Sequence, residues 1–183
     1  MKMFATLFVV FAIASSALGE CPVPPTVPGA DIGKIAGRWY EIAGPTRNFT
    51  CMTWDYTPRE DGNFNSTTLS TLPDGSKDAE YMLAERADDQ NLLNLYAMSH
   101  RTPYPITFYI ADTDYDNYLA AYTCVVVPWR SDILSGLILS RTNTMDAEKY
   151  AELTDLLVNK IGVSSDVVGP ITQKDCKYWP VPQ

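Results

Sequence analysis

The sequence predicts an all-β protein with one added α-helix. Short runs rich in aromatic and branched residues recur along the chain, and clusters of turn residues separate them. Strands that recur at intervals of about 8–12 residues are typical of an antiparallel sandwich or barrel. One later stretch has the apolar period of a helix instead. The chain is long enough for one domain with a sizeable core.

Eight strands are predicted, and turn residues such as Asp61–Gly62 and Pro73–Gly75 separate them. Asp-Gly pairs flanked by strands are strong hairpin signals. The expected strands, in chain order, are Arg38–Gly44, Met52–Pro58, Phe64–Thr71, Asp78–Arg86, Leu92–Ser99, Ile106–Thr113, Tyr118–Val127 and Asp132–Arg141.

A helix is expected over residues 145–161. Acidic side chains in its first turn and a lysine in its last turn suit the helix dipole, and Gly162 is placed to end it. The helix follows the eighth strand, and its apolar face is expected to pack on the outside of the sheet. That face carries Tyr150, Leu153, Leu157 and Ile161. A short extended piece, Val168–Thr172, is a further candidate strand.

The N-terminal residues have the pattern of a secretory signal peptide. Lys2 precedes the apolar run Phe4–Ala14, and the small residues Ala17 and Gly19 follow it. The run is shorter than the roughly 20 apolar residues that a membrane span needs. We therefore expect residues 1–19 to be removed, residues 20–183 to form the mature domain, and the protein to be secreted and extracellular.

The charge of the chain argues against a nucleic-acid partner. The formal net charge is −8, and the bases form no cluster. Nucleic-acid phosphates require clustered Lys and Arg, so no nucleic acid is expected to bind. No later stretch is apolar and long enough to predict a transmembrane segment. The sequence leaves association into homo- or hetero-oligomers open.

The cysteines predict disulfides rather than a metal site. An even number of cysteines in an exported chain implies two disulfides, with three connectivities open; the residues are Cys21, Cys51, Cys124 and Cys176. Their spacings are too wide for a zinc finger, and His100 is the single histidine, so no metal is expected. Asn48 and Asn65 head two sequons and are candidate glycosylation sites.

Three motifs resemble those of the lipocalin family. The run GRWYEIAG, residues 37–44, is similar to the Gly-x-Trp motif that begins the first lipocalin strand. The run TDYDNYLAAYTC, residues 113–124, is similar to the second motif, and Arg141 stands where the third motif has its arginine. The motifs occur in the family order, and the resemblance covers nearly the whole mature chain. Within the family it extends to the invertebrate carriers of bilins or carotenoids.

The resemblance implies an eight-stranded antiparallel up-and-down barrel with one α-helix packed on its outside. It implies that Trp39 lies across the closed end of the barrel, with the Arg141 guanidinium over its ring. Gly37 is then expected to let the backbone approach closely at that end. The structural motif residues that the resemblance assigns are Gly37, Trp39, Thr113, Asp114, Tyr115 and Arg141. The disulfides that it implies are Cys21–Cys124 and Cys51–Cys176.

The candidate ligand contacts come from strand alternation within that barrel. Because side chains alternate along a strand, one residue of known direction sets the direction of the others. With Trp39 and Arg141 inward and Cys124 outward, the expected interior is largely apolar, with small residues that leave space. This alternation gives Glu41, Ala43, Leu119, Ala121, Thr123, Ser135, Leu137 and Leu139. On the sixth strand Phe108 and Ile110 are assigned inward, with Tyr109 and Ala111 as the alternative. The sequence does not separate the faces of the fourth and fifth strands, which offer Tyr81, Met82, Leu83, Leu93, Leu95 and Tyr96, and Tyr81 and Leu95 complete the set of candidate contacts.

The function that the resemblance implies is the binding and transport of a small hydrophobic ligand, such as a lipid, a sterol, a fatty acid or a retinoid-like molecule. No cofactor is required, and a non-covalently bound bilin or carotenoid is the pigment-binding alternative. A third reading is a defence or interaction protein that uses the barrel as a scaffold. Its partner would contact rings in the loops and the tail, such as Tyr104, Trp129 and Trp179.

An enzyme is not expected. A thiolate nucleophile needs an unpaired cysteine, and two disulfides would leave none. A serine–histidine pair would need His100, which lies in a predicted turn.

Overall fold

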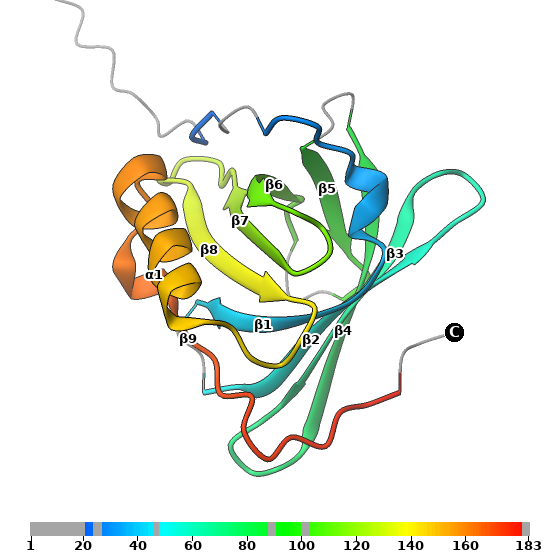
Figure 1. Ribbon diagram of the computed structural model, residues 1–183. Coiled ribbons are helices and arrows are strands. Elements are labelled where there is room, and N and C mark those ends of the chain that lie inside the picture. The colour runs from blue at the N-terminus through cyan, green and yellow to red at the C-terminus, as the bar shows by residue number, and fades with distance from the viewer. Residues whose placement is uncertain (1–20, 24–26, 46–47, 88–90, 100–102, 181–183) are drawn as a thin grey trace, which may run out of the picture.

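The computed structural model describes residues 21–23, 27–45, 48–87, 91–99 and 103–180 (Figure 1). The strands are β1 (Gly37–Gly44), β2 (Thr50–Pro58), β3 (Phe64–Thr71), β4 (Lys77–Arg86), β5 (Leu92–Ala97), β6 (Ile106–Thr113), β7 (Tyr118–Val125), β8 (Ile133–Ser140) and the two-residue β9 (Gly169–Pro170). Strands β5 and β7 each end two residues before the predicted boundary.

The sheet closes on itself into a barrel. Neighbouring strands follow the order β2–β3–β4–β5–β6–β7–β8–β1, and β1 pairs in addition with β2. All of these pairings are antiparallel, and the β1–β2 register places Trp39 opposite Trp54. Because β1 and β2 pair with each other, the barrel sheet has no free edge where its first and last strands meet. The predicted eight-stranded antiparallel up-and-down barrel is therefore confirmed (Figure 1).

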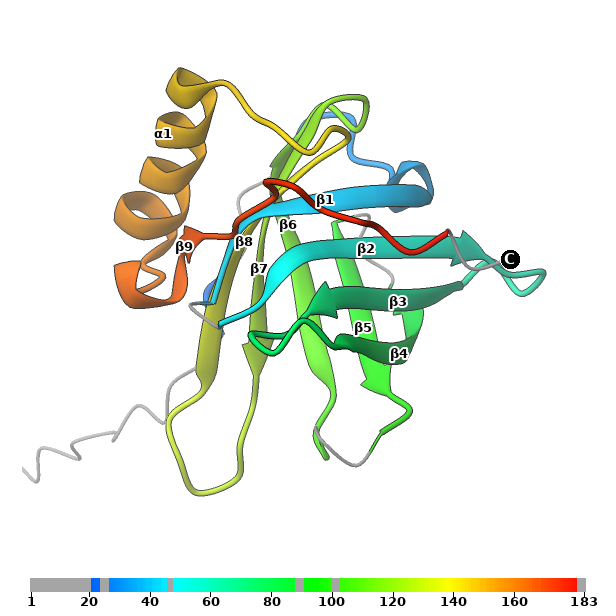
Figure 2. The same cartoon turned by 90° about the horizontal axis from the view of Figure 1, so that it is seen from below.

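A helix lies outside the barrel, against β8 (Figures 1 and 2). Helix α1 (Ala147–Asp155) begins at Asp146, whose side chain accepts two backbone N–H hydrogen bonds from the first turn. The helix continues as a π-helical turn, η2 (Leu156–Ile161). This helical segment ends at Gly162, whose φ is 88°. The predicted helix and its position outside the sheet are confirmed.

Two hydrophobic clusters stabilise this arrangement, one inside the barrel and one between the barrel and the helix. In the outer cluster, Leu153 and Leu157 are fully buried against outward-facing side chains of β7 and β8 such as Tyr122 and Ile138. Gly136 of β8 leaves space for this cluster, because a Cβ there would lie 2.5 Å from Val168 Cγ2 and 3.4 Å from Leu157 Cδ1. The apolar stripe read from the sequence is thus the buried face of the helix.

The segment after β9 crosses the outside of β1 and β2 (Figure 2). Gln173 Nε2 donates hydrogen bonds to the carbonyl of Glu41 on β1 (2.8 Å) and of Met52 on β2 (2.9 Å). Arg38 Nη1 donates to the Trp179 carbonyl (2.7 Å) and pairs through Nη2 with the buried carboxylate of Asp55 (2.8 Å). These contacts bind the C-terminal segment to the barrel wall that also lines the interior.

Candidate ligand-binding cavity

The barrel interior has an open half and a packed half. A cavity of about 310 Å³ lies toward the end where β1 leads into β2, β3 into β4, β5 into β6 and β7 into β8, since its lining residues fall at those strand ends. The lining residues are Glu41, Pro45, Phe49, Met52, Trp54, Thr68, Ser70, Asp78, Glu80, Met82, Ala97, Ile106, Thr123, Ser135, Leu137 and Ile171.

The cavity has an apolar wall with polar groups at a few places. Trp54, Met82 and Leu137 contribute large apolar surfaces and are each less than a tenth exposed. Hydroxyl groups come from Thr68, Ser70, Thr123 and Ser135, and carboxylates from Glu41, Asp78 and Glu80. An apolar wall with a few polar groups is the usual construction of a small-molecule site.

Trp54, which lines the cavity, packs against buried aromatic rings of the barrel interior. Its ring centroid lies 6.1 Å from that of Phe108 and 6.3 Å from that of Tyr56. Phe108 and Tyr56 are buried, and burial raises the pKa of Tyr56 well above its usual value, so its phenol stays neutral. Trp54 is therefore backed by neutral, packed rings where it faces the cavity.

The twelve expected ligand contacts fall into three groups. Four of them line the cavity: Glu41, Thr123, Ser135 and Leu137. Six point into the interior but are fully buried in the packed half: Leu95, Phe108, Ile110, Leu119, Ala121 and Leu139. The remaining two, Ala43 and Tyr81, do not face the interior.

The inward direction expected for Ala43 is wrong because of a β-bulge. The register between β1 and β8 shifts between Glu41 and Ala43. An extra residue in one strand reverses the alternation beyond it. Glu41 therefore faces the cavity, whereas Ala43 packs in the outer cluster beneath α1.

The inward direction expected for Tyr81 is wrong because β4 has the opposite phase. Tyr81 is 51% exposed, whereas the next residue, Met82, is 4% exposed and lines the cavity. Both faces of this strand carry large side chains, so the sequence offers no period from which to choose the phase.

The cavity-lining residues on β2, β3 and β4 are not among the candidate contacts predicted from the sequence. Trp54 could have been found from the β1–β2 register, since it lies directly opposite Trp39. Thr68, Asp78 and Glu80 carry no such signal, because polar residues in a strand are normally read as its solvent face.

Glu41 is the most enclosed polar group on the wall, with 1% of its surface exposed. Its Oε2 accepts a hydrogen bond from the Trp54 indole Nε1 (2.5 Å). Its Oε1 occupies the place that a Cβ at Gly44 would take. The glycine that ends β1 thus makes room for the carboxylate, and the opposite strand orients it.

The closed end of the barrel is built around Trp39, which is fully buried. The Arg141 guanidinium carbon lies 3.6 Å from the centroid of its ring. Arg141 also donates to the carbonyls of Tyr115 (3.0 Å), Arg38 (3.0 Å) and Lys34 (3.1 Å). Burial lowers the pKa of Arg141 against an opposing effect of Asp116, but an arginine remains protonated at neutral pH.

Two further features complete the closed end. The short 3-10 helix η1 (Ile32–Ile35) covers it, and Trp39 Nε1 donates to the Ile35 carbonyl (2.8 Å). Gly37 has φ of 95°, and a Cβ there would lie 3.3 Å from Arg141 Nη1. Trp39 and Arg141 thus close the end of the barrel opposite the cavity, and they do not line the cavity.

The turn between β6 and β7 holds the second motif. Asp114 accepts hydrogen bonds from the backbone N–H of Asn117 (2.8 Å) and Tyr118 (3.0 Å). Thr113 Oγ1 accepts from the Tyr115 N–H (2.8 Å), and Tyr115, at φ of 63°, accepts through its hydroxyl from the N–H of Asp31 (2.9 Å). These residues shape the turn next to Arg141.

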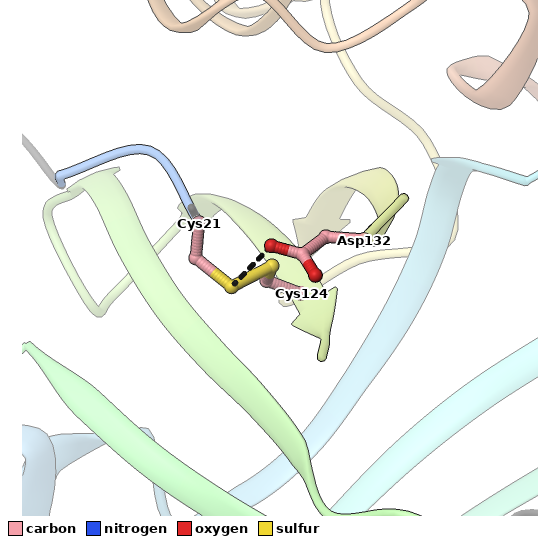
Figure 3. A group of neighbouring side chains, drawn as sticks. All are labelled: Cys21, Cys124 and Asp132. Carbon is pink, nitrogen blue, oxygen red and sulfur yellow. Dashed lines mark hydrogen bonds between the residues drawn. A yellow bond between two sulfur atoms is a disulfide. The ribbon is translucent and has the colours of Figure 1, made fainter. Parts of the chain in front are cut away.

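Both pairings that the resemblance implied are present: Cys21 with Cys124 and Cys51 with Cys176. Asp132 lies beside the first pair, with its Oδ2 3.9 Å from Cys21 Sγ (Figure 3). Because the two sulfurs are bonded to each other, neither offers a thiolate to a metal ion. The group in Figure 3 is a disulfide next to a carboxylate.

The structure bears on the predicted sequons and on membrane-spanning helices, but it does not describe every residue singled out in the sequence. Both sequon asparagines, Asn48 and Asn65, are exposed. Among the described residues, no helix has the length and apolarity needed to cross a membrane. The signal-peptide residues and His100 lie outside the described residues.

A closed barrel with an internal cavity defines a class of small-molecule-binding proteins. Residues 36–175 match the Lipocalin / cytosolic fatty-acid binding protein family, and the chain belongs to that family. It is similar to apolipoprotein D of Mus musculus, with 29% identity over 183 residues and 96% of each chain covered. It is also similar to apolipoprotein D of Oryctolagus cuniculus, with 28% identity and 82% of each chain covered. The resemblance read from the three motifs is confirmed.

Solved structures share the fold at low sequence identity. Insecticyanin from the tobacco hornworm Manduca sexta superposes with a TM-score of 0.67 at 19% identity, over 87% of this chain and 90% of that one. Apocrustacyanin C1 superposes with a TM-score of 0.64 at 17% identity, over 86% and 91% of the two chains.

Proposed function

We propose that this lipocalin binds a small hydrophobic molecule reversibly in its barrel and carries it. The observation that supports this most directly is the cavity of about 310 Å³ within the barrel wall, with Trp54 on that wall packed against Phe108. An interior with no transport role would be better packed, because each unfilled volume costs stability. A lipid, a sterol, a fatty acid and a retinoid-like molecule are the ligand classes expected from the family.

Filling the cavity tests this function. Ala97→Trp places an indole in the cavity from β5 and is expected to abolish binding of a neutral hydrophobic fluorescent probe. Tyr96→Trp is the matched control, because Tyr96 is 39% exposed on the outer face of the same strand, and it should bind as the wild type does. Equal probe binding by both variants would place the ligand elsewhere.

The pigment-binding alternative is tested on protein from its native source. An absorption band between roughly 400 and 700 nm with an extractable chromophore would identify a bilin or carotenoid carrier. A colourless protein that yields a lipid or sterol by organic extraction and mass spectrometry would identify a lipid carrier. Phe49 and Trp54 are the aromatic side chains on the cavity wall against which a pigment would stack.

The scaffold alternative has less support, because the rings of the tail pack on the barrel wall, whereas Tyr104 and Trp129 are exposed in segments between strands. Trp129 is 95% exposed in the segment between β7 and β8. Tyr178 packs edge-on against Tyr40 of β1 at 5.0 Å, and Lys77 lies over the Trp179 ring at 5.9 Å. A partner that bound all of these rings would have to contact both the segments between strands and the tail on the barrel wall.

We also propose that the protein is secreted after removal of residues 1–19, that residues 20–183 form the mature domain, and that Asn48 and Asn65 carry glycans. Two disulfides suit an oxidising compartment. N-terminal sequencing of the secreted product and its mobility after glycosidase treatment test these points. An enzyme is not proposed, since all four cysteines are paired and supply no thiolate.

A further inference from the structure

An apolar patch lies on the outer face of β4 and β5. Leu83 of β4 pairs with Tyr96 of β5. The Met98 N–H, just after β5, donates to the Tyr81 carbonyl of β4 (2.9 Å), so these two residues also lie opposite each other. Tyr81 is 51% exposed, Tyr96 39% and Met98 65%. Apolar side chains that are exposed together, rather than singly, mark a surface that another group covers. We call these four residues the outer patch.

The sequon at Asn65 lies beside the outer patch. The register between β3 and β4 places Asn65 opposite Leu83, and it places Thr67 of the same sequon opposite Tyr81. Residues opposite each other share a face of the sheet and lie about 5 Å apart between Cβ atoms, while diagonal neighbours lie about 7–8 Å apart. Asn65 is exposed. A sugar attached to it therefore begins next to Leu83 and within reach of Tyr81.

Arg59 sets the direction in which the Asn65 amide faces. Arg59 Nη1 donates to Asn65 Oδ1 (3.0 Å), and Nη2 of the same guanidinium pairs with Asp61 Oδ2 (3.1 Å). A guanidinium can only donate, so it is the amide oxygen that faces Arg59. Arg59 follows the end of β2, and β2 pairs with β3 on the side opposite to β4. The amide nitrogen, to which a glycan is attached, therefore lies away from the turn between β2 and β3.

The outer patch has the chemistry that suits a sugar. One face of a pyranose ring presents C–H groups, which pack on the electron-rich face of an aromatic ring. The tyrosine hydroxyls can in addition donate to sugar oxygens. On the other side of Asn65 the opposite residue is Thr57 of β2, which offers no ring. Strands lie about 4.8 Å apart, so Tyr96 is about 10 Å from Asn65, within reach of a second sugar.

We propose that the first sugars of an N-linked glycan on Asn65 pack on the outer patch, with Tyr81 as the main stacking partner and Tyr96 beyond it. This inference rests on the proposed glycosylation of Asn65. It gives that glycan a fixed place on the barrel, where it covers apolar surface that would otherwise face water.

The tyrosines of the outer patch report whether it is covered. The full secreted chain is compared with Asn65→Gln, which keeps a carboxamide but accepts no glycan, and with the glycosidase-treated protein. Nitration of each tyrosine by tetranitromethane is followed by peptide mass spectrometry. We expect Tyr81 and Tyr96 to react several-fold more slowly in the glycosylated protein. Tyr104 is the matched control, since it is also 39% exposed but lies between β5 and β6, outside the patch, and its rate should not change.

Thermal unfolding tests whether the glycan and Tyr81 are coupled. Asn65→Gln is expected to lower the midpoint by about 2–4 °C, the shift that one weak contact gives in a domain of this size. In the Tyr81→Thr background, which removes the ring at an exposed strand position, Asn65→Gln should lower the midpoint much less. Asn48→Gln removes the other sequon and is the control, because its effect should be the same with and without Tyr81→Thr.

Mass spectrometry of the Asn65 peptide separates the two proposals. If Asn65 of the secreted protein carries no sugar, its proposed glycosylation fails and the inference falls with it. If Asn65 is occupied but Tyr81 and Tyr96 react equally with and without the glycan, the packing is overturned while the glycosylation stands. Stabilisation by the glycan that survives Tyr81→Thr would overturn it as well. Equal protection of both rings in a dimer on gel filtration would show that a second copy covers the patch instead.

Discussion

Arg141 makes both a cation–π contact with Trp39 and hydrogen bonds with the backbone at the closed end of the barrel. The guanidinium lies over the indole at 3.6 Å and donates to carbonyls of three different segments of the chain. One side chain thereby joins η1, β1 and the turn between β6 and β7. Its contribution is to the stability of the barrel end, since the cavity lies in the other half of the interior.

Replacing Arg141 should therefore destabilise the fold. Arg141→Ala is expected to lower the free energy of unfolding by about 3 kcal/mol, from a lost cation–π contact and unsatisfied buried carbonyls. Arg141→Lys should be intermediate, because an ammonium cannot make the same three hydrogen bonds. Equilibrium urea unfolding measures both. Arg130→Ala, at an exposed position, is the control, and an equal loss in that variant would contradict this role.

Asp114 should make the stability depend on pH. Burial alone would raise the pKa of its carboxyl, but hydrogen bonds from Asn117 and Tyr118 outweigh burial and hold the pKa below its usual value of 3.8. A depressed pKa in the folded state adds stability above the unfolded-state pKa, and that stability is lost as the pH falls through the folded-state pKa.

The corresponding variant is Asp114→Asn. At pH 7 it should be less stable than the wild type by about 0.5 kcal/mol, a small cost because the residue is exposed. As the pH falls from 7 through the folded-state pKa, it should lose less stability than the wild type, since it lacks the titrating group. Urea unfolding across that range measures this, with the exposed Asp175→Asn as control. Parallel curves for Asp114→Asn and wild type would refute the assignment.

At the scale of elements, helix α1 is positioned by the surface on which it packs. Gly136 lies on β8 where the chain after the helix approaches most closely, and Val168 occupies the space that a side chain would need. Val163 Cγ1 and Leu157 Cδ1 lie next nearest, at 3.3 and 3.4 Å from the position of that Cβ. Helix propensity and the Asp146 cap set where the helix begins, while this glycine sets how closely the following segment approaches the sheet.

Gly136→Ala should test that contact. The added Cβ would overlap Val168 Cγ2 and is expected to cost about 1–3 kcal/mol of stability through overpacking. Val168→Ala removes the overlapping methyl groups, so the double variant should lose less stability than the two single variants added together. Thermal and urea unfolding of the four proteins provide the measurement. Strict additivity would mean that the two residues are not coupled.

At the scale of the whole molecule, the barrel and its disulfides restrict the same chain in different ways. Closure pairs β1 with both β2 and β8, and the disulfides join residues 103 and 125 positions apart. The Cys51–Cys176 bridge fastens the C-terminal segment to the start of β2, next to the Gln173 hydrogen bonds.

Removing the second bridge should therefore weaken the fold without changing it. The double variant Cys51→Ala/Cys176→Ala is expected to lose about 2–5 kcal/mol of stability, because the unfolded chain gains freedom. Far-ultraviolet circular dichroism should stay that of a β-barrel, while the midpoint of thermal unfolding falls. An unchanged midpoint would show that the C-terminal segment is held by its other contacts alone.

Local patterns in the sequence predict the eight barrel strands, their order along the chain and the helix, and the resemblance of its motifs predicts the contact between Trp39 and Arg141. Strand and helix periods are local, so a single chain reveals them, and Trp39, Asp114 and Arg141 lie in motifs with a characteristic order. The alternation of side chains along β7 and β8 places Thr123 and Leu137 on the inner face of the barrel, where both line the cavity.

Which interior positions stay open depends on how the strands pack together. The bulge between Glu41 and Ala43 follows from the pairing of β1 with β8, which is far along the chain, and the phase of β4 follows from its register with β3 and β5. The period within one strand records neither of them. The polar side chains of Asp78 and Glu80, for which the sequence offers no sign of an inward position, line the cavity. A cavity is the volume that packing leaves unfilled, and that volume depends on all the strands at once.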